Sequence, residues 1–87
     1  MRLKLVYGGR LLFSEFPGCG RVNVVPVLQS VKKTHPDIYE TWCNQEGSLR
    51  NSLPVFINGE HIRYRGGMEA ELHDGDKVYV IPILSGG

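Results

Sequence analysis

The segment VVPVLQSV, residues 24–31, repeats its apolar residues with the period of an α-helix. These residues are Val24, Val27, Leu28 and Val31, at positions i, i+3, i+4 and i+7. This spacing places their side chains on one face of a helix. Pro26 is compatible with this helix, because it lies in the first turn, where its missing N–H would have no partner. The spacing predicts a main helix that Pro36 ends.

The residues before this helix alternate polar and apolar side chains, which is typical of strands. Residues 2–7 predict a first strand and residues 21–24 a second, and we expect the two to pair as a hairpin. Gly8-Gly9 predicts a turn. Residues 11–13 are either a short continuation of the first strand or a packed loop.

Residues 37–43 predict a second, short helix, with Asp37 as its cap and with Ile38 and Trp42 facing inward. The polar residues 44–52 that follow predict a loop.

The rest of the chain predicts further strands. Residues 53–57 and 60–64 flank Asn58-Gly59, a strong hairpin signal, and residues 77–84 form the last strand. Local hairpins around one long helix indicate an α+β fold, a sheet with a helix packed on one face.

Composition excludes several classes of function. The chain has 87 residues and a net charge of +1, which suits one small domain and gives no basic field for nucleic acid. Its longest uncharged apolar run, residues 78–84, falls far short of the roughly 20 residues of a membrane span. Residues 1–4 lack the apolar block of a signal peptide, so we expect a cytoplasmic protein with no membrane partner.

The cysteines and histidines predict neither a metal site nor a catalytic thiol. Cys19 and Cys43 form no C-x-x-C motif and are expected to be free thiols, although one disulfide is possible. The three histidines are scattered without ligand spacing.

Gly86-Gly87 differs from the other glycine pairs, because no element follows it in this sequence. One interpretation is a frayed end or a linker. The other is an activated terminus: a carboxylate can be adenylated with ATP and then attacked by a nucleophile, and glycine lets the backbone enter a narrow channel. Pro82 favours an extended chain that leaves the sheet.

Three stretches carry a resemblance to a known family: residues 55–60 (VFINGE), 72–78 (LHDGDKV) and 81–87 (IPILSGG). In this order they resemble the MoaD/ThiS family of ubiquitin-like sulfur carriers, and the chain is also similar to the cysteine-synthesis sulfur carrier and the ubiquitin-related modifier. The resemblance implies a β-grasp fold, a mixed sheet of four to five strands packed on one main helix. It also implies a domain at residues 1–84 and a C-terminal Gly-Gly tail at residues 85–87.

The resemblance further implies a cycle in which the chain is a cosubstrate and not an enzyme. A ThiF/MoeB-like adenylyltransferase would use ATP to adenylate Gly87, with Gly86 threading into its channel. A persulfide or sulfide would then convert Gly87 to a thiocarboxylate. The acceptor would be an enzyme such as a molybdopterin synthase large subunit or a cysteine synthase-like protein. No cofactor would be bound to the chain itself.

The last strand predicts where partners dock. We expect Val78 and Val80 to pack on the helix. The other side of the strand, together with Tyr7, would form a docking patch made of Tyr7, Tyr79, Ile81 and Ile83. The docking surface of the family implies the same assignment. The alternative is that residues 37–52, with Trp42, cover this face.

Two charged groups have simpler interpretations. Arg63 and Arg65, which flank Tyr64, could pair with acidic partner residues or form a solvated edge. Asp74 and Asp76 bracket a glycine, so turn formation explains them better than acid–base catalysis.

Three functions remain open from the sequence. The leading one is a sulfur carrier for molybdopterin, thiazole, cysteine or tRNA thiolation. The second is a protein modifier joined to lysines through Gly87, which shares the adenylation chemistry. The third is a small binding subunit whose terminus is never activated.

Overall fold

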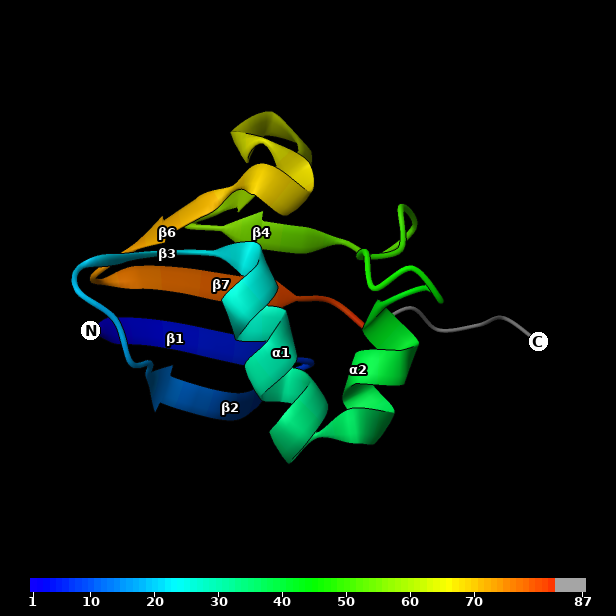
Figure 1. Cartoon of the computed structure of the whole chain (residues 1–87). Helices are drawn as coiled ribbons and strands as arrows, with labels where there is room; N and C mark the ends of the chain where they lie inside the picture. The colour runs from blue at the N-terminus through cyan, green and yellow to red at the C-terminus, as the bar shows by residue number, and fades with distance from the viewer. Residues whose placement is uncertain (83–87) are drawn as a thin grey trace.

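The computed structural model describes residues 1–82. A five-stranded mixed sheet carries two helices on one side (Figure 1). Its strand order is β2-β1-β7-β4-β5, and its strands are β1 (Arg2–Tyr7), β2 (Arg10–Glu15), β4 (Val55–Ile57), β5 (Glu60–His61) and β7 (Asp76–Val80). The expected α+β class and the five-stranded sheet are confirmed.

The main helix forms where its period predicts. Helix α1 (Val24–Thr34) buries Val24, Val27, Leu28 and Val31, and it ends one residue before His35. Its last turn carries Lys32 and Lys33, which favour the negative end of the helix dipole. One apolar face therefore fixes α1 against the sheet.

The short second helix is confirmed, but its expected cap is wrong. Helix α2 (Pro36–Trp42) begins at Pro36, because the fixed φ of proline suits the first helical position. Asp37 thus lies in the first turn instead of capping it. Ile38 and Trp42 are buried, as expected.

The expected pairing of the first two strands is wrong. β1 pairs antiparallel with β2, and the turn between them is Gly8-Gly9, with φ values of +57° and +81°. Both glycines occupy the left-handed region that a tight hairpin requires. The segment expected to pair with β1 is instead β3 (Arg21–Asn23), which pairs with β6 (Glu71–His73) in a separate two-stranded ladder.

Two later strands are shorter than expected. The Asn58-Gly59 hairpin is confirmed, but its return strand β5 stops at His61. The chain then forms the 3₁₀ turns η1 (Ile62–Arg65) and η2 (Gly67–Glu69), in which Ile62 turns into the core. β7 begins at Asp76 and ends at Val80 rather than at residue 84.

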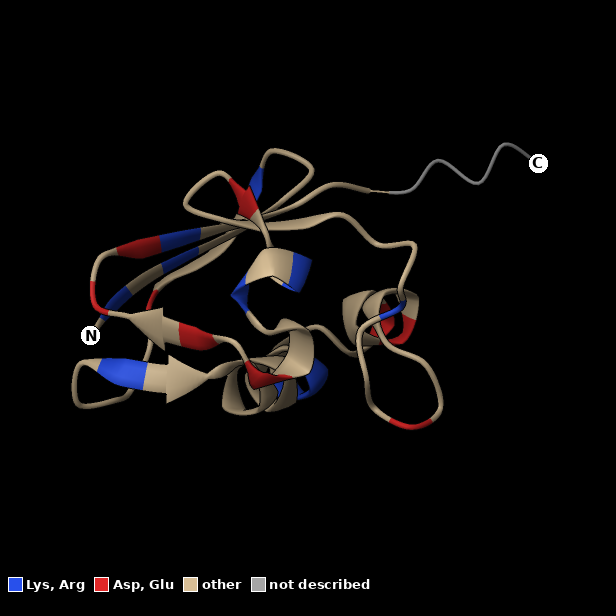
Figure 2. Cartoon of the chain, turned by 90° about the horizontal axis from the view of Figure 1, so that it is seen from above, with Lys and Arg blue, Asp and Glu red and all other residues tan. Residues whose placement is uncertain are grey.

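The core lies between the sheet and the helices. The sheet supplies six of its side chains, from β1, β4 and β7: Leu3, Leu5, Val55, Ile57, Val78 and Val80. Trp42 closes one end and is 1% exposed. No helix in residues 1–82 is both long and apolar enough to cross a membrane. Among residues 1–82, both α-helices lie on one side of the sheet, and the opposite side carries none (Figure 2).

Candidate functional site

The last described strand is held at the centre of the sheet. β7 pairs parallel with β1 and antiparallel with β4. Beyond its last residue, the N–H of Ile81 donates to the carbonyl oxygen of Pro54 at 3.0 Å, and the N–H of Gly8 donates to the carbonyl oxygen of Val80 at 3.1 Å. The backbone at Val80 and Ile81 is therefore held between β1 and β4, at the point where the chain leaves the sheet.

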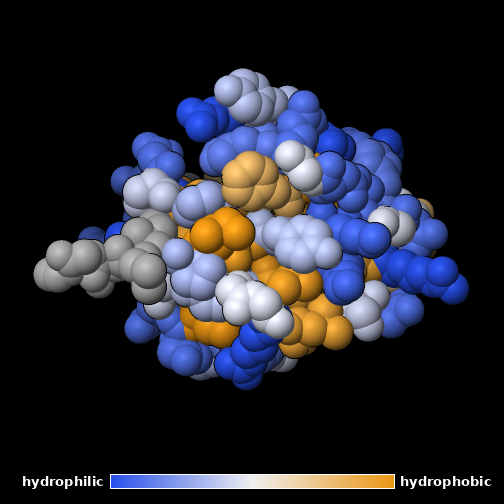
Figure 3. Space-filling view, turned by 180° about the vertical axis from the view of Figure 1, so that it is seen from behind, coloured by the Kyte–Doolittle hydropathy of each residue, from blue (hydrophilic) through white to orange (hydrophobic). Residues whose placement is uncertain are grey.

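A row of side chains crosses all five strands on the side without helices. The strand register aligns them in the order Leu11, Val6, Tyr79, Phe56 and His61, which we call the apolar row. Leu11 and Tyr79 are exposed, and the rings of Phe56 and His61 meet edge to face at 5.4 Å. Hydrophobic side chains gather over this face (Figure 3).

The apolar row continues toward the C-terminal segment. Ile81 follows Tyr79 by two residues and is 47% exposed. Its N–H still pairs with the carbonyl oxygen of Pro54 just beyond β7, so the alternation of the strand continues to Ile81 and keeps it on the side of Tyr79. Val78 and Val80 lie in the core on the helix side, as expected. The structure therefore confirms which side of β7 is exposed. The docking role of Tyr79 and Ile81 stays a prediction.

Tyr7 does not share this face, and its expected grouping with Tyr79 is wrong. It follows Leu3 and Leu5 at a spacing of two, and it packs on the core against Trp42, with ring centroids 5.3 Å apart. Tyr7 instead lines an open groove on the helix side, beside Pro82.

The alternative that residues 37–52, with Trp42, cover the predicted docking patch holds for Tyr7, which Trp42 contacts, but not for the exposed Tyr79 and Ile81. Trp42 belongs to the core beneath the helices, and Leu49 packs against that same core. The row therefore stays open to a partner within the described part of the chain.

Three of the expected site residues, Ile83, Gly86 and Gly87, lie outside the described residues. Sequence reasoning missed four members of the row, whose alignment depends on the strand register: Val6, Leu11, Phe56 and His61. The spacing of two from Leu3 and Leu5 was a signal that Tyr7 faces the core and Val6 does not.

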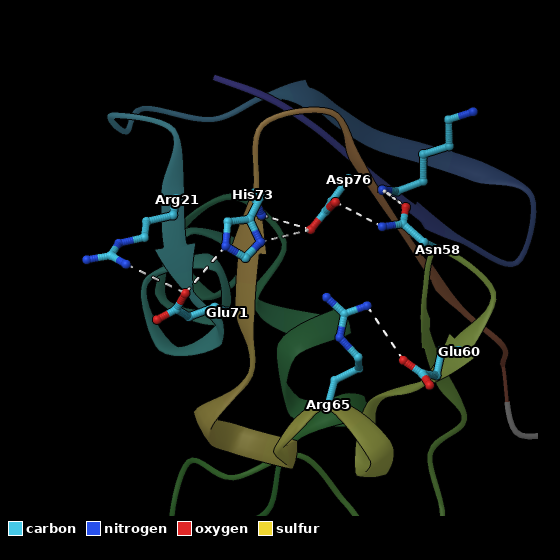
Figure 4. Close-up of polar contacts among 8 residues, drawn as sticks. Arg21, Asn58, Glu60, Arg65, Glu71, His73 and Asp76 are labelled. Atoms are coloured by element: carbon cyan, nitrogen blue, oxygen red, sulfur yellow. Dashed lines mark hydrogen bonds and ion pairs between the residues drawn. The ribbon is translucent and has the colours of Figure 1, made fainter.

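Asp74 and Asp76 stabilise turns of the backbone, as expected. Asp74 Oδ1 accepts the N–H of Arg2 at 2.6 Å. Asp76 accepts the N–H of His73 at 2.8 Å and Nδ2 of Asn58 at 2.9 Å, which links two turns (Figure 4). Both carboxylates are thus occupied by structural hydrogen bonds.

Arg63 and Arg65 both contact side chains of this same chain. Arg65 forms an ion pair with Glu60 at 3.7 Å, and the guanidinium of Arg63 lies 5.5 Å from the ring centre of Tyr64. These contacts agree with a solvated edge.

The two thiols differ in burial, and neither forms a disulfide within residues 1–82. Cys19 is exposed, Cys43 is buried, and both are free. Burial raises the pKa of the Cys43 thiol above its ordinary value, which disfavours the nucleophilic thiolate. No cluster of three His, Cys, Asp or Glu residues in this range could hold a metal ion.

The architecture defines the class of the protein: a sheet that wraps a helix, with its last strand at the centre, is a β-grasp, ubiquitin-like domain. Among solved structures it is similar to the Amycolatopsis orientalis BexX/CysO complex, with a TM-score of 0.75 and 26% identity over 98% of this chain and 99% of that chain. Small archaeal modifier protein 1 of Methanosarcina acetivorans gives a TM-score of 0.71 and 27% identity over 99% and 96% of the two chains.

The ThiS family model matches residues 14–87, and the chain belongs to this family. A protein of Archaeoglobus fulgidus with the provisional name sulfur carrier protein is 37% identical over 48 residues, 55% of this chain and 54% of its own. Sulfur carrier protein CysO of Mycobacterium tuberculosis is 34% identical over 41 residues, 47% and 44% of the two chains. The chain thus matches about half the length of these curated relatives.

Proposed function

We propose that this chain is a sulfur carrier protein whose Gly87 is adenylated by a ThiF/MoeB-like enzyme and converted to a thiocarboxylate. One observation carries the proposal: the match to the ThiS family runs through residue 87 and includes the terminal glycine pair. The names of the relatives in Archaeoglobus and Mycobacterium support the same role.

The proposed chemistry has two steps. The carboxylate oxygen of Gly87 attacks the α-phosphorus of ATP, which forms an acyl-adenylate and releases pyrophosphate. Hydrosulfide then attacks the acyl carbon, the bond to AMP breaks, and one proton is released as the thiocarboxylate forms. No oxidation or reduction occurs, and no group on the chain needs to act as acid or base.

The geometry at the end of β7 supports this role. Ile81 and Val80 are anchored by hydrogen bonds to Pro54 and Gly8. Five residues follow Pro82, and five extended residues span at most about 18 Å. Any enzyme that holds the Gly87 carboxylate must therefore come close to the C-terminal end of β7.

The apolar row and Ile81 are the surface that we propose such an enzyme covers. Among residues 1–82, no helix covers the side that carries the row, and Ile81 lies two residues beyond Tyr79 along the chain. Apolar and aromatic side chains of this kind supply most of the binding free energy at protein interfaces. The adenylyltransferase and then the sulfur acceptor would use the row in turn.

The test is accurate mass spectrometry of the purified chain after incubation with the cognate adenylyltransferase, ATP and sulfide. We expect one oxygen of Gly87 to be replaced by sulfur, located by fragmentation of the C-terminal peptide. Accurate mass is needed because oxidation of methionine or cysteine adds nearly the same nominal mass. A chain that lacks Gly86 and Gly87 is the control. An unmodified Gly87 carboxylate in the complete reaction would contradict the proposal and favour a binding subunit that is never activated.

A second candidate function is conjugation to protein lysines through Gly87. The likeness to small archaeal modifier protein 1, at 27% identity over nearly the whole chain, favours it. The products separate the two functions. A carrier gives a free thiocarboxylate, whereas a modifier gives branched peptides in which Gly87 is joined to a lysine.

The acceptor enzyme is tested separately from activation. We propose a molybdopterin synthase large subunit or a cysteine synthase-like enzyme. Adding each to the thiocarboxylate form and following the loss of sulfur from Gly87 would distinguish them.

A further inference from the structure

Two lysines stand side by side on the face that carries the apolar row. Lys4 of β1 and Lys77 of β7 are partners in the parallel register, and both are exposed. Alternation along each strand places them on the same side as Val6 and Tyr79. Basic positions of neighbouring strands lie together at this end of the sheet (Figure 2).

Neither lysine has an acidic side chain within ion-pair distance in the described part of the chain. The ion pairs of residues 1–82 involve other basic groups, and none includes Lys4 or Lys77. Glu15 and Asp76 line the same shallow hollow as the two lysines, but neither forms an ion pair with them. The Asp76 carboxylate keeps its negative charge, but its oxygens accept hydrogen bonds from the N–H of His73 and the amide of Asn58.

The arrangement is unfavourable for the isolated chain. Neighbouring strands are about 4.8 Å apart, and like charges placed directly opposite each other destabilise a sheet. The net charge of the whole chain is only +1, so the pair is a local feature and not part of a generally basic surface. Such a local concentration of charge suits binding to a group of opposite sign.

The lysines border the apolar row. Along each strand they precede Val6 and Tyr79 by two residues, a separation of about 7 Å. A protein that covers the row therefore brings its own side chains beside both ammonium groups. Ile81 is exposed beside the row and precedes the C-terminal segment. The protein that binds Gly87 is therefore expected to cover the row and to contact the two lysines.

We infer that Lys4 and Lys77 together recognise acidic side chains of the adenylyltransferase, which lie beside the surface of that enzyme that contacts the apolar row. The inference rests on the proposed function. Complementary charges at the border of an interface mainly set association rate and partner choice, and salt screens them. The lysines would thus select the correct enzyme and leave the chemical step unchanged.

The test is ATP–pyrophosphate exchange by the cognate adenylyltransferase, measured against carrier concentration at low and moderate salt. The variants are Lys4→Glu, Lys77→Glu and the double variant. Lys33→Glu, an exposed lysine of α1 on the helix side, is the matched control. We expect the KM of the double variant to rise tenfold or more with kcat within twofold, and Lys33→Glu to behave as the unmodified chain. The salt dependence of KM should be smaller in the double variant.

The outcomes separate this inference from the proposed function. Exchange with an unchanged KM in the double variant, or an equal rise in Lys33→Glu, would overturn the inference alone. No exchange by the unmodified chain would overturn the proposed function and this inference with it. Folding is checked by thermal unfolding, in which Lys4→Glu and Lys77→Glu should each melt at the same or a higher temperature, because each places opposite charges together.

Discussion

Gly8 lies against the ring of Pro82 so closely that a Cβ on Gly8 would be 2.6 Å from Cγ of the proline. The φ of Gly8 is +57°, in the left-handed region that other residues rarely adopt. The β1–β2 turn therefore touches the chain at the last described residue before the C-terminal segment. Position 8 therefore favours glycine for two physical reasons: its positive φ and the lack of space for a Cβ beside Pro82.

Gly8→Ala should destabilise the domain more than Gly9→Ala. Both glycines have positive φ, so each alanine stores about 1–2 kcal/mol of backbone strain. Only position 8 adds an overlap, because nothing lies within 4 Å of a Cβ on Gly9. Urea unfolding of the two variants measures the difference. Pro82→Ala in the Gly8→Ala background should recover part of it, and equal losses at positions 8 and 9 would show that the contact is absent.

Asp76→Ala should cost about 1–3 kcal/mol of unfolding free energy, because two donors lose their acceptor. The carboxylate joins the N–H of His73 to the amide of Asn58, and Asn58 in turn accepts the N–H of Lys77. The unfolding free energy of Asp76→Asn should lie between those of the original chain and Asp76→Ala, since asparagine keeps one acceptor oxygen. Denaturant unfolding measures all three.

The control for this series is Glu46→Ala, which removes an exposed carboxylate from the loop after α2. Its effect should stay within about 0.5 kcal/mol. If Asp76→Ala fell in the same range, the link between the two turns would contribute nothing to stability.

Cys43 should make stability depend on pH in alkaline solution. Burial raises the pKa of its thiol above the ordinary value of 9.0 in the folded chain. Well below pH 9.0 the thiol is protonated in both states and its contribution is complete. As the pH rises further, the unfolded chain ionises first, so the free energy of unfolding falls. Cys43→Ala should lose less stability between about pH 8 and pH 10 than the unmodified chain.

Alkylation gives a second readout of the same difference. Iodoacetamide at about pH 8 should label exposed Cys19 in the native chain and spare Cys43 until urea is added. Equal labelling of both thiols under native conditions would contradict the burial of Cys43.

The sequence predicted the elements better than their partners. The helical period of residues 24–31 and the turn at Asn58-Gly59 are local signals, and both are confirmed. Strand pairing is not local: residues 21–23 alternate like a hairpin partner of β1, yet they pair with β6, some fifty residues later. Alternation shows that a strand forms, but it does not show which strand lies beside it.

The same limit applies to the candidate site. The exposed side of β7 followed from alternation, and Tyr79 and Ile81 are exposed. The apolar row did not follow, because Leu11 meets Val6 through a register shift between β1 and β2. Gly86 and Gly87 are predicted from the sequence alone, and they lie outside the described residues.

Ile81→Asp should weaken adenylation of Gly87 through binding and not through folding. Val25→Asp is the matched control: the two side chains are 47% and 46% exposed, but Val25 belongs to α1, on the helix side of the sheet. Burying a new carboxylate against an apolar partner surface costs well over the 1.4 kcal/mol that corresponds to a tenfold change in affinity. ATP–pyrophosphate exchange should therefore show a KM raised at least tenfold for Ile81→Asp and unchanged for Val25→Asp, with both chains unfolding like the original. An equal KM for the two variants would mean that the adenylyltransferase holds the C-terminal segment without covering the row.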